Sequence, residues 1–204
     1  MSAHDSVELA AVRPDFAAIA AWIPKGASVL DLGCGDGSLL RFLRDMREVR
    51  GYGVDINDAN IVACIRNGVN VIQDDLDTGL SGFESLSFDY VILSQTLQAI
   101  RHTEALVQEI LRVGKAGIVS FPNFGYWRNR LKILCGNMPV SRELPYQWYD
   151  TPNVHLCTLC DFEDFCANQN VQILDRRVMT GGEQVKVLPN LLGSTAVYRF
   201  QRRA

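Results

Sequence analysis

Three closely spaced glycines follow the first apolar run that is typical of a buried strand. The stretch reads VLDLGCGDG at residues 29–37 and precedes a helical pattern. Glycine at such a junction permits a tight turn and lets a ligand approach the backbone, because no Cβ intervenes. The spacing is G-x-G-x-G, so the G-x-G-x-x-G spacing of nicotinamide and flavin enzymes is not met. The carboxylate of Asp31 would repel a pyrophosphate but suits an ammonium or sulfonium group.

Polar side chains follow the next apolar runs at the points where the runs end. Asp55 ends the second run, and a carboxylate there can accept both hydroxyls of a ribose in charge-assisted hydrogen bonds. Asp75 follows the third run and could accept from an adenine amino group, although Asp74 and Asp77 flank it and could take its role. Ser94 follows the fourth run. Together these strand ends predict an adenosine-type pocket.

Short apolar runs alternate with helical patterns along the chain. Runs typical of strands buried on both faces of a parallel sheet are found at 28–32, 51–55, 69–73, 88–93 and 117–121. Helical spacing is found at 16–23, at 39–46, after Asn57 and Asp58 as caps, and from Thr103 to Gly114. A last helix at 161–168, with Asp161 as its N-cap, and strands at 171–178 and 196–200 complete the pattern. One domain over 1–204 is predicted, a doubly wound α/β sheet of seven strands with ligands outside their carboxyl ends.

Residues 122–160 interrupt this alternation. They hold four of the 7 prolines and two of the 3 tryptophans, Trp127 and Trp148. A connection of this length without a regular pattern is typical of a lid, a binding loop or an interface. The insert therefore either closes over a small substrate or presents Trp and Tyr to another protein, since these residues are enriched at interfaces.

Composition limits the classes of function. The chain has 204 residues, with 20 Lys+Arg and 23 Asp+Glu, and its net charge of -3 gives no electrostatic footprint for nucleic acid. The longest apolar run, 16–23, is far shorter than the roughly 18 residues that cross a bilayer, so no membrane span is expected. The N-terminus lacks the pattern of a secretory signal. The 6 cysteines are therefore expected to be reduced, buried thiols of a cytoplasmic protein.

Few side chains offer catalytic chemistry. His102 is the histidine nearest in sequence to the expected pocket, but it is interpreted as a surface residue at a helix start. His155 could face the pocket together with Tyr146, although a loop histidine satisfied within the protein is the better interpretation. No catalytic residue is assigned and no metal site is expected. The metal-capable side chains in this region are irregularly spaced for zinc: His155, Cys157, Cys160 and Cys166.

The motifs together resemble class I S-adenosylmethionine-dependent methyltransferases. That resemblance is carried by VLDLGCGDG, by GVD at 53–55, by QDDL at 73–76 and by FDYVILSQTL at 88–97. From about 13 to 203 the chain also resembles the MetW family of methionine-biosynthesis proteins, above all in FPNFGYWRNRLKIL and LPYQWYDTPNVHLCT. The resemblance implies a Rossmann-like, seven-stranded class I methyltransferase fold with an aromatic-rich insert between strands five and six.

The resemblance further implies that S-adenosylmethionine or S-adenosylhomocysteine binds at the strand ends. The glycine loop would pass beneath the methionyl part of this cofactor, and Asp31 would face its amino group. Asp55 would hold the ribose, Ile56 would pack on the adenine, and Asp75 would meet the adenine edge. The full set of implied cofactor-binding residues is Asp31, Gly33, Cys34, Gly35, Asp55, Ile56, Asp75, Leu76 and Ser94.

MetW proteins are linked to the homoserine O-acyltransferase of methionine synthesis, so the resemblance favours a protein partner for the insert at 122–160. The expected function is that of an accessory protein that binds the adenosyl cofactor and supports or regulates homoserine acylation. The alternative is a small-molecule methyltransferase that uses the insert as a lid. A transcriptional regulator is disfavoured by the net charge and by the lack of a helix-turn-helix pattern.

Overall fold

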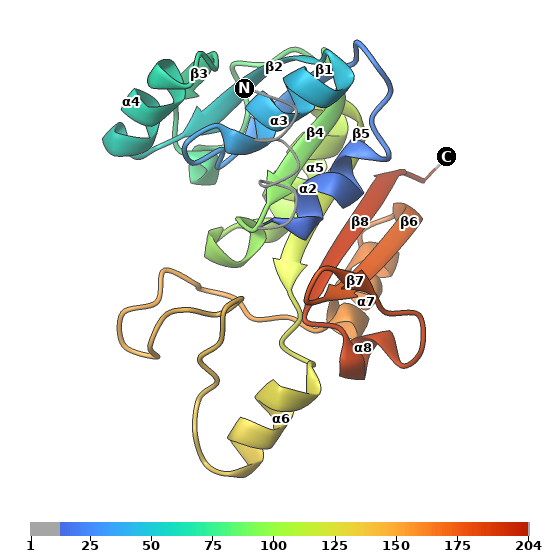
Figure 1. Ribbon diagram of the computed structural model, residues 1–204. Helices are drawn as coiled ribbons and strands as arrows, with labels where there is room; N and C mark the ends of the chain where they lie inside the picture. The colour runs from blue at the N-terminus through green and yellow to red at the C-terminus, as the bar shows by residue number, and fades with distance from the viewer. Residues whose placement is uncertain (1–12, 204) are drawn as a thin grey trace.

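A mixed sheet of eight strands runs through the protein (Figure 1). The computed structural model describes residues 13–203. The strands lie in the order β3-β2-β1-β4-β5-β8-β6-β7, of which the first five pair in parallel and the last three are joined by antiparallel pairing. Their bounds are β1 Ser28–Leu32, β2 Arg50–Asp55, β3 Val71–Gln73, β4 Phe88–Ser94, β5 Gly114–Pro122, β6 Val171–Thr180, β7 Glu183–Gln184 and β8 Thr195–Arg202. The predicted doubly wound α/β architecture is confirmed.

The number of strands departs from the seven that the sequence predicts. The additional strand, β7, has only two residues and pairs with the end of β6. Gly181 and Gly182 form the turn between them, with φ of 60° and 91°. A two-residue hairpin turn needs such positive φ angles, which glycine adopts without steric cost. A strand of two residues is too short to show a hydrophobic alternation, so the sequence pattern could not reveal it.

Helices cover both faces of the sheet. Helices α2 and α3 bury their apolar residues on one face, where α4 contributes Cys64, and α5 and α7 bury theirs on the other (Figure 1). Successive side chains of a strand point to opposite faces, so Val29 packs with the first group and Leu30 with the second. The helices are α2 Pro14–Ala20, α3 Ser38–Arg47, α4 Asp58–Arg66, α5 Thr103–Val113, α6 Trp127–Leu134, α7 Leu159–Asn168 and α8 Pro189–Leu192, with short turns η1 Leu76–Thr78 and η2 Leu97–Ala99.

Two helix starts test the capping residues expected from the sequence. Asn57 is confirmed as the N-cap of α4, because its side chain accepts from the backbone amides of Ala59 and Asn60. The expectation for α7 is wrong, since its N-cap is Thr158 and not Asp161. Asp161 is the third helical residue, and its carboxylate accepts from the Thr158 amide at 2.8 Å while Thr158 accepts in return. This reciprocal capping box satisfies two amides that the helix itself cannot.

The insert between β5 and α7 contains a helix that the sequence analysis did not expect. Helix α6 occupies Trp127–Leu134, and the remainder of the insert is irregular (Figure 1). The apolar residues of α6 are largely exposed, so no buried stripe marks the helix in the way that burial marks α3 or α5. Trp127 and Trp148 are 40% and 73% exposed, and neither belongs to the core.

The cysteines and the lengths of the helices bear on two further expectations. All six cysteines are free. Cys34, Cys64 and Cys166 are buried as expected, whereas Cys135 and Cys160 are exposed, so the expectation of buried thiols is wrong for these two. Within residues 13–203 no helix has the length and apolar character needed to cross a membrane.

The capping box of α7 is expected to contribute measurably to stability. Thr158→Ala removes the side-chain oxygen that accepts from the Asp161 amide, and it should lower the free energy of unfolding by about 1 kcal/mol. Thr158→Ser keeps the oxygen and serves as the matched control. Urea denaturation of the three proteins measures the difference, and equal stabilities of the alanine and serine variants would contradict the capping role.

Candidate functional site

The glycine loop connects β1 to α3 at the carboxyl edge of the sheet. Gly33 and Gly35 have φ of 67° and 57°, a region that other residues adopt at a cost. A Cβ on Gly33 would lie 2.5 Å from the Thr96 side chain, so the close approach of the segment after β4 also requires glycine. A Cβ on Gly35 would meet no described atom within 4 Å. The loop is therefore open on the Gly35 side, where the sequence analysis expects the ligand.

Asp55 joins the end of β2 to this loop. Its Oδ2 accepts from the Gly35 amide at 2.9 Å, and its Oδ1 accepts from the Asn57 amide and the Asn60 side chain at 2.9 and 3.1 Å. A carboxylate has about four acceptor positions, so one remains, on Oδ2. The structure thus leaves room for one ribose hydroxyl, and acceptance of both would require the Gly35 amide to release its bond.

Asp31 is a buried carboxyl group with an unpaired oxygen. Its side chain is 1% exposed, and Oδ1 has no hydrogen-bond partner among residues 13–203. Burial, with smaller contributions from the charges of Asp55 and Asp15, raises the pKa of Asp31 to about 8, against the opposing effect of Arg13. Burying a charge without a partner is costly, so the surroundings of Asp31 favour the protonated carboxyl. An ammonium group close to Asp31 would reverse that preference.

The Cys34 side chain points away from the open side of the loop. Its sulfur lies 3.7 Å from that of Cys64 on α4, beneath the loop, and burial raises the pKa of the Cys34 thiol above its ordinary value. Cys34 is therefore a packing residue, and only its backbone can line a ligand site.

The residues expected around the adenine lie along the neighbouring strand ends. Ile56 directly follows Asp55 and is 62% exposed. Asp75 caps the η1 turn through a 3.0 Å bond from the Asp77 amide, so part of its acceptor capacity is used locally. Leu76 is half-buried against the main core. These three residues lie on the β2–β3 side of the site.

Ser94 belongs to a polar network that the sequence analysis missed. Its hydroxyl lies 3.1 Å from Asp15 Oδ2 and 3.2 Å from the Ser120 hydroxyl, and it accepts from Arg13 at 3.2 Å. Arg13 also pairs with Asp15 through two bonds of 3.0 and 2.9 Å. Gln95, whose φ is 56°, donates to the same Ser120 hydroxyl. No local sequence motif predicts this network, because its members come from three distant parts of the chain.

A cavity of about 440 Å³ opens beside this network. It lies between the start of α2, the end of β4, the insert and the β6–β7 turn, and its walls include Arg13, Gln95, Glu143 and Tyr146. His155 does not join Tyr146 there, because it lines a different cavity with His102. Among the described residues, no group of three His, Cys, Asp or Glu side chains is placed to hold a metal ion.

The electrostatics of the strand ends favour a cationic ligand. Asp15, Asp31 and Asp55 are all buried, and Arg13 is the cation that pairs with one of them. The site thus carries a surplus of negative charge whenever Asp31 is ionised. A ligand that brings a positive charge would lower the free energy of that arrangement, whereas a pyrophosphate would raise it.

Solved structures identify the class of fold. A Pyrococcus horikoshii protein is 20% identical with a TM-score of 0.69, covering 99% of this chain and 92% of that chain. An S-adenosylmethionine dependent methyltransferase from Mesorhizobium loti is 17% identical with a TM-score of 0.68, covering 94% and 98%. Magnesium protoporphyrin IX methyltransferase from Synechocystis, solved with bound S-adenosylhomocysteine, is 19% identical with a TM-score of 0.65, covering 94% and 84%. The chain has the class I methyltransferase fold, and at these identities the likeness shows the fold alone.

The family follows from closer matches. The family model described as Methionine biosynthesis protein MetW matches residues 13–200. A protein of Rhodopirellula baltica named bifunctional methionine biosynthesis protein MetXA/MetW is 39% identical over 195 residues, covering 88% of this chain. The chain belongs to the MetW family. It spans 31% of the length of that bifunctional relative.

The raised pKa of Asp31 predicts a pH dependence of stability. Between pH 3.8, the ordinary pKa of an aspartate side chain, and about pH 8, the folded protein holds a proton at Asp31 that the unfolded chain has released. The stability contributed by this proton is present at low pH and falls as pH rises, by at most about 1.4 kcal/mol per pH unit. Asp31→Asn cannot titrate, so the stability of the wild type relative to Asp31→Asn should fall from about pH 5 to about pH 8.

Urea unfolding of the ligand-free proteins at several pH values measures this difference. Asp58→Asn, which alters an exposed carboxyl group, controls for the loss of one negative charge. A wild-type profile parallel to that of Asp31→Asn over the whole range would show that Asp31 is ionised throughout.

Proposed function

We propose that this protein binds S-adenosylmethionine or S-adenosylhomocysteine and acts in the cytoplasm as an accessory subunit that supports or regulates homoserine O-acyltransferase. The main support for this partner is the bifunctional relative, whose name joins MetXA and MetW in one chain. Two activities fused in one relative are expected to work together where they are separate. The class I fold and the strand-end site support the proposal that the protein binds this ligand.

The proposed cofactor occupies the carboxyl ends of β1, β2 and β4. Its amino group takes the place of the missing partner of Asp31, and one ribose hydroxyl donates to the remaining position on Asp55. The exposed face of Ile56 packs against the adenine, and Gly35 leaves space for the ligand to approach the backbone. Asp75, Leu76 and Ser94 complete the proposed set, with Ser94 supported by Arg13 and Asp15.

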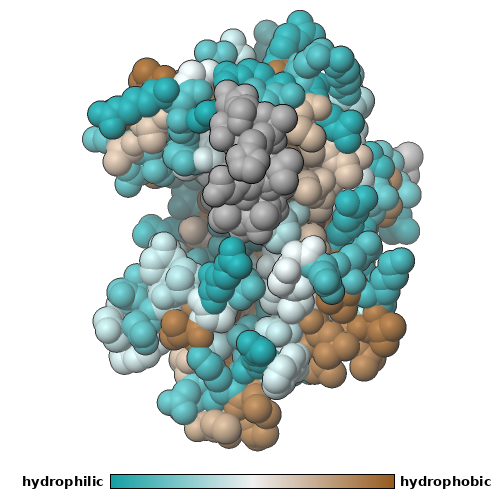
Figure 2. Space-filling view, viewed as in Figure 1, coloured by the Kyte–Doolittle hydropathy of each residue, from teal (hydrophilic) through white to brown (hydrophobic). Residues whose placement is uncertain are grey.

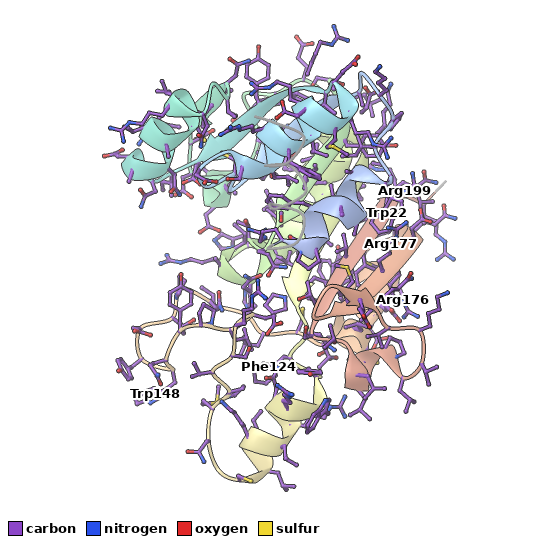
Figure 3. The ribbon with its side chains drawn as sticks, in the orientation of Figure 1. Trp22, Phe124, Trp148, Arg176, Arg177 and Arg199 are labelled. Atoms are coloured by element: carbon purple, nitrogen blue, oxygen red, sulfur yellow. The ribbon has the colours of Figure 1, made fainter. Side chains whose placement is uncertain are left out.

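The insert provides the proposed contact surface for the acyltransferase. Trp148 lies at the outer end of the insert and points away from the sheet (Figure 3). Apolar residues also gather at the far end of α6, where Leu134 is 83% exposed, and outside the insert near α8, where Val187 is 71% exposed (Figure 2). Exposed apolar residues gathered in this way are typical of protein interaction sites. We propose Trp127 and Trp148 as anchors of this interface.

A second function is favoured by one observation. The 440 Å³ cavity beside Ser94 has the size of a small-molecule site and adjoins the expected methionyl end of the cofactor. A small methyl acceptor could occupy it, in which case the protein is a methyltransferase with the insert as its lid. Formation of S-adenosylhomocysteine from S-adenosylmethionine on adding a pool of cellular metabolites would support this function, and its absence would favour the accessory role.

Cofactor binding is tested by thermal unfolding. A ligand that binds only the folded state raises the melting temperature, so S-adenosylmethionine or S-adenosylhomocysteine should each shift that of the wild type upward. Asp55→Asn keeps the size of the side chain but removes its charge, and it should weaken binding about tenfold or more, since hydrogen bonds to charged groups contribute about 1.5–3 kcal/mol. Asp58→Asn is the control. If neither ligand shifts the wild type, the cofactor proposal is wrong.

The regulatory part of the proposal requires coupling between the ligand and the partner. A coupling free energy of about 1–3 kcal/mol would change the affinity of the protein for S-adenosylmethionine about five- to 150-fold when the acyltransferase is bound. Calorimetry with and without purified homoserine O-acyltransferase measures this change, and acyltransferase activity with and without the protein measures support. Equal affinities with an intact complex would reject sensing and leave the accessory role, because a ligand that binds both states equally shifts neither.

A further inference from the structure

A larger cavity lies on the face of the sheet that α5 and α7 cover. Its volume is about 540 Å³, which is within the range of small-molecule sites. Its interior is aromatic: Phe121 and Phe162 are buried with ring centroids 5.0 Å apart, and Phe165 stacks on Phe162 at 6.3 Å. The half-buried Cys157 also lines it. This cavity is distinct from the strand-end site, because no residue of the glycine loop contributes to it.

The outer wall of the cavity is held in place by the backbone. The Val154 and His155 amides donate to the Gln98 carbonyl at 2.8 and 3.0 Å. The His155 ring nitrogen Nε2 lies 3.3 Å from the Arg101 carbonyl, which can only accept, so Nε2 is the donor. The insert is thereby fixed to the segment after β4, and the cavity between them has a defined shape.

The charged residues at the mouth are unequal in their pairing. Glu104 accepts from the Gln169 side chain at 2.8 Å, and Asp161 is occupied by the capping box of α7. The side chains of Arg101 and His102, by contrast, are exposed and make no hydrogen bond or ion pair within residues 13–203. Glu104 and Asp161 keep their negative charges, because their hydrogen-bond donors are neutral, and Arg101 is the cation at the mouth that no carboxylate among residues 13–203 pairs with.

Two sets of polar groups at the mouth and in the wall of the cavity lack hydrogen-bond partners among the described residues. Helix α5 has 11 residues and begins at the mouth, and no side chain in the described part of the chain caps its N-terminus. Its first amides thus carry a partial positive charge that suits a carboxylate. Gln98 also lines the cavity, and its buried Oε1 has no hydrogen-bond partner among the described residues. Such a buried acceptor costs free energy until a donor reaches it.

We propose that this cavity binds a small aromatic monocarboxylate. The ring packs against the wall of the cavity that Phe121, Phe162 and Phe165 form, where burial of its apolar surface provides most of the affinity. The carboxylate lies at the mouth, near Arg101, His102 and the start of α5. The site depends on neither the proposed cofactor nor the proposed partner.

Indole-3-propionate is a suitable probe, and indole-3-propionamide is its neutral counterpart. Amide chemical shifts of the full-length, ¹⁵N-labelled protein are followed during titration with each compound. Saturable shifts are expected for Ala105 and Cys157, which line the cavity, with the carboxylate bound about fivefold more tightly than the amide. No saturable shift up to the solubility limit, or equal affinities for the two compounds, would overturn the proposal.

Two pairs of variants locate the binding. Ala105 is exposed on α5 and lines the cavity, so Ala105→Trp should fill the mouth and abolish binding, whereas Ala167→Trp, at an exposed position on α7 outside the cavity, should not. Arg101→Gln should raise the dissociation constant of the carboxylate about fivefold and leave that of the amide unchanged. Arg66→Gln, on α4, is its control. Binding that survives both Ala105→Trp and Arg101→Gln would place the ligand elsewhere and overturn the assignment.

Discussion

The hydrogen bond from the Gly35 amide to the Asp55 carboxylate is the constraint on which the strand-end site depends. It connects the loop after β1 to the end of β2, and it holds Gly35 at a φ that other residues adopt at a cost. The same carboxylate accepts from Asn57, the N-cap of α4, so one side chain fixes the glycine loop and the helix start. Asp55 is buried and fully engaged on Oδ1, which leaves Oδ2 as the group that can meet a ligand.

The three buried carboxyl groups of the site differ in how their charges are compensated. Asp15 is compensated by Arg13, and Asp55 is compensated by amides, whereas Asp31 has an unpaired oxygen. A low-dielectric site tolerates one uncompensated acid by protonating it, which is why the pKa of Asp31 rises. Ionisation of Asp31 therefore adds an uncompensated negative charge to the site. A cation at Asp31 would compensate the charge where the fold provides no partner.

Local sequence patterns predicted the parts of the site that one strand end carries. The glycine loop, Asp31 and Asp55 each follow an apolar run, and parallel strands bring such ends to one edge. The network around Ser94 could not be predicted in this way, because Asp15 and Ser120 lie 79 and 26 residues from Ser94 and meet it only in the folded chain. The orientation of Cys34 also escaped the sequence, since it depends on the packing of its sulfur against Cys64.

Elements outside the core were harder to predict for a related reason. Helix α6 keeps its apolar residues exposed, so its pattern did not stand out from the prolines and aromatic residues around it. Asp161 resembles an N-cap, but Thr158 takes that position because a reciprocal bond pair satisfies two helix amides instead of one. A helix or strand that is buried on one face shows a regular hydrophobic period in its sequence. Where a segment is not buried, this period is missing and several local structures remain close in free energy.

Gln98 lies between the two cavities and contributes to both. It lines both the 440 Å³ cavity near Ser94 and the 540 Å³ aromatic cavity, and its carbonyl holds the insert through Val154 and His155. Its side chain donates to the Gln95 carbonyl at 2.7 Å, and Gln95 directly follows Ser94. A rearrangement of the strand end that shifts Gln95 would therefore act on the hydrogen bonds that Gln98 makes to Gln95, Val154 and His155. If the proposed cofactor acts on a partner at the insert, these hydrogen bonds form one route for its effect, and the bond from the Ser194 hydroxyl to Glu143 forms another, because coupling requires contacts that differ between two arrangements.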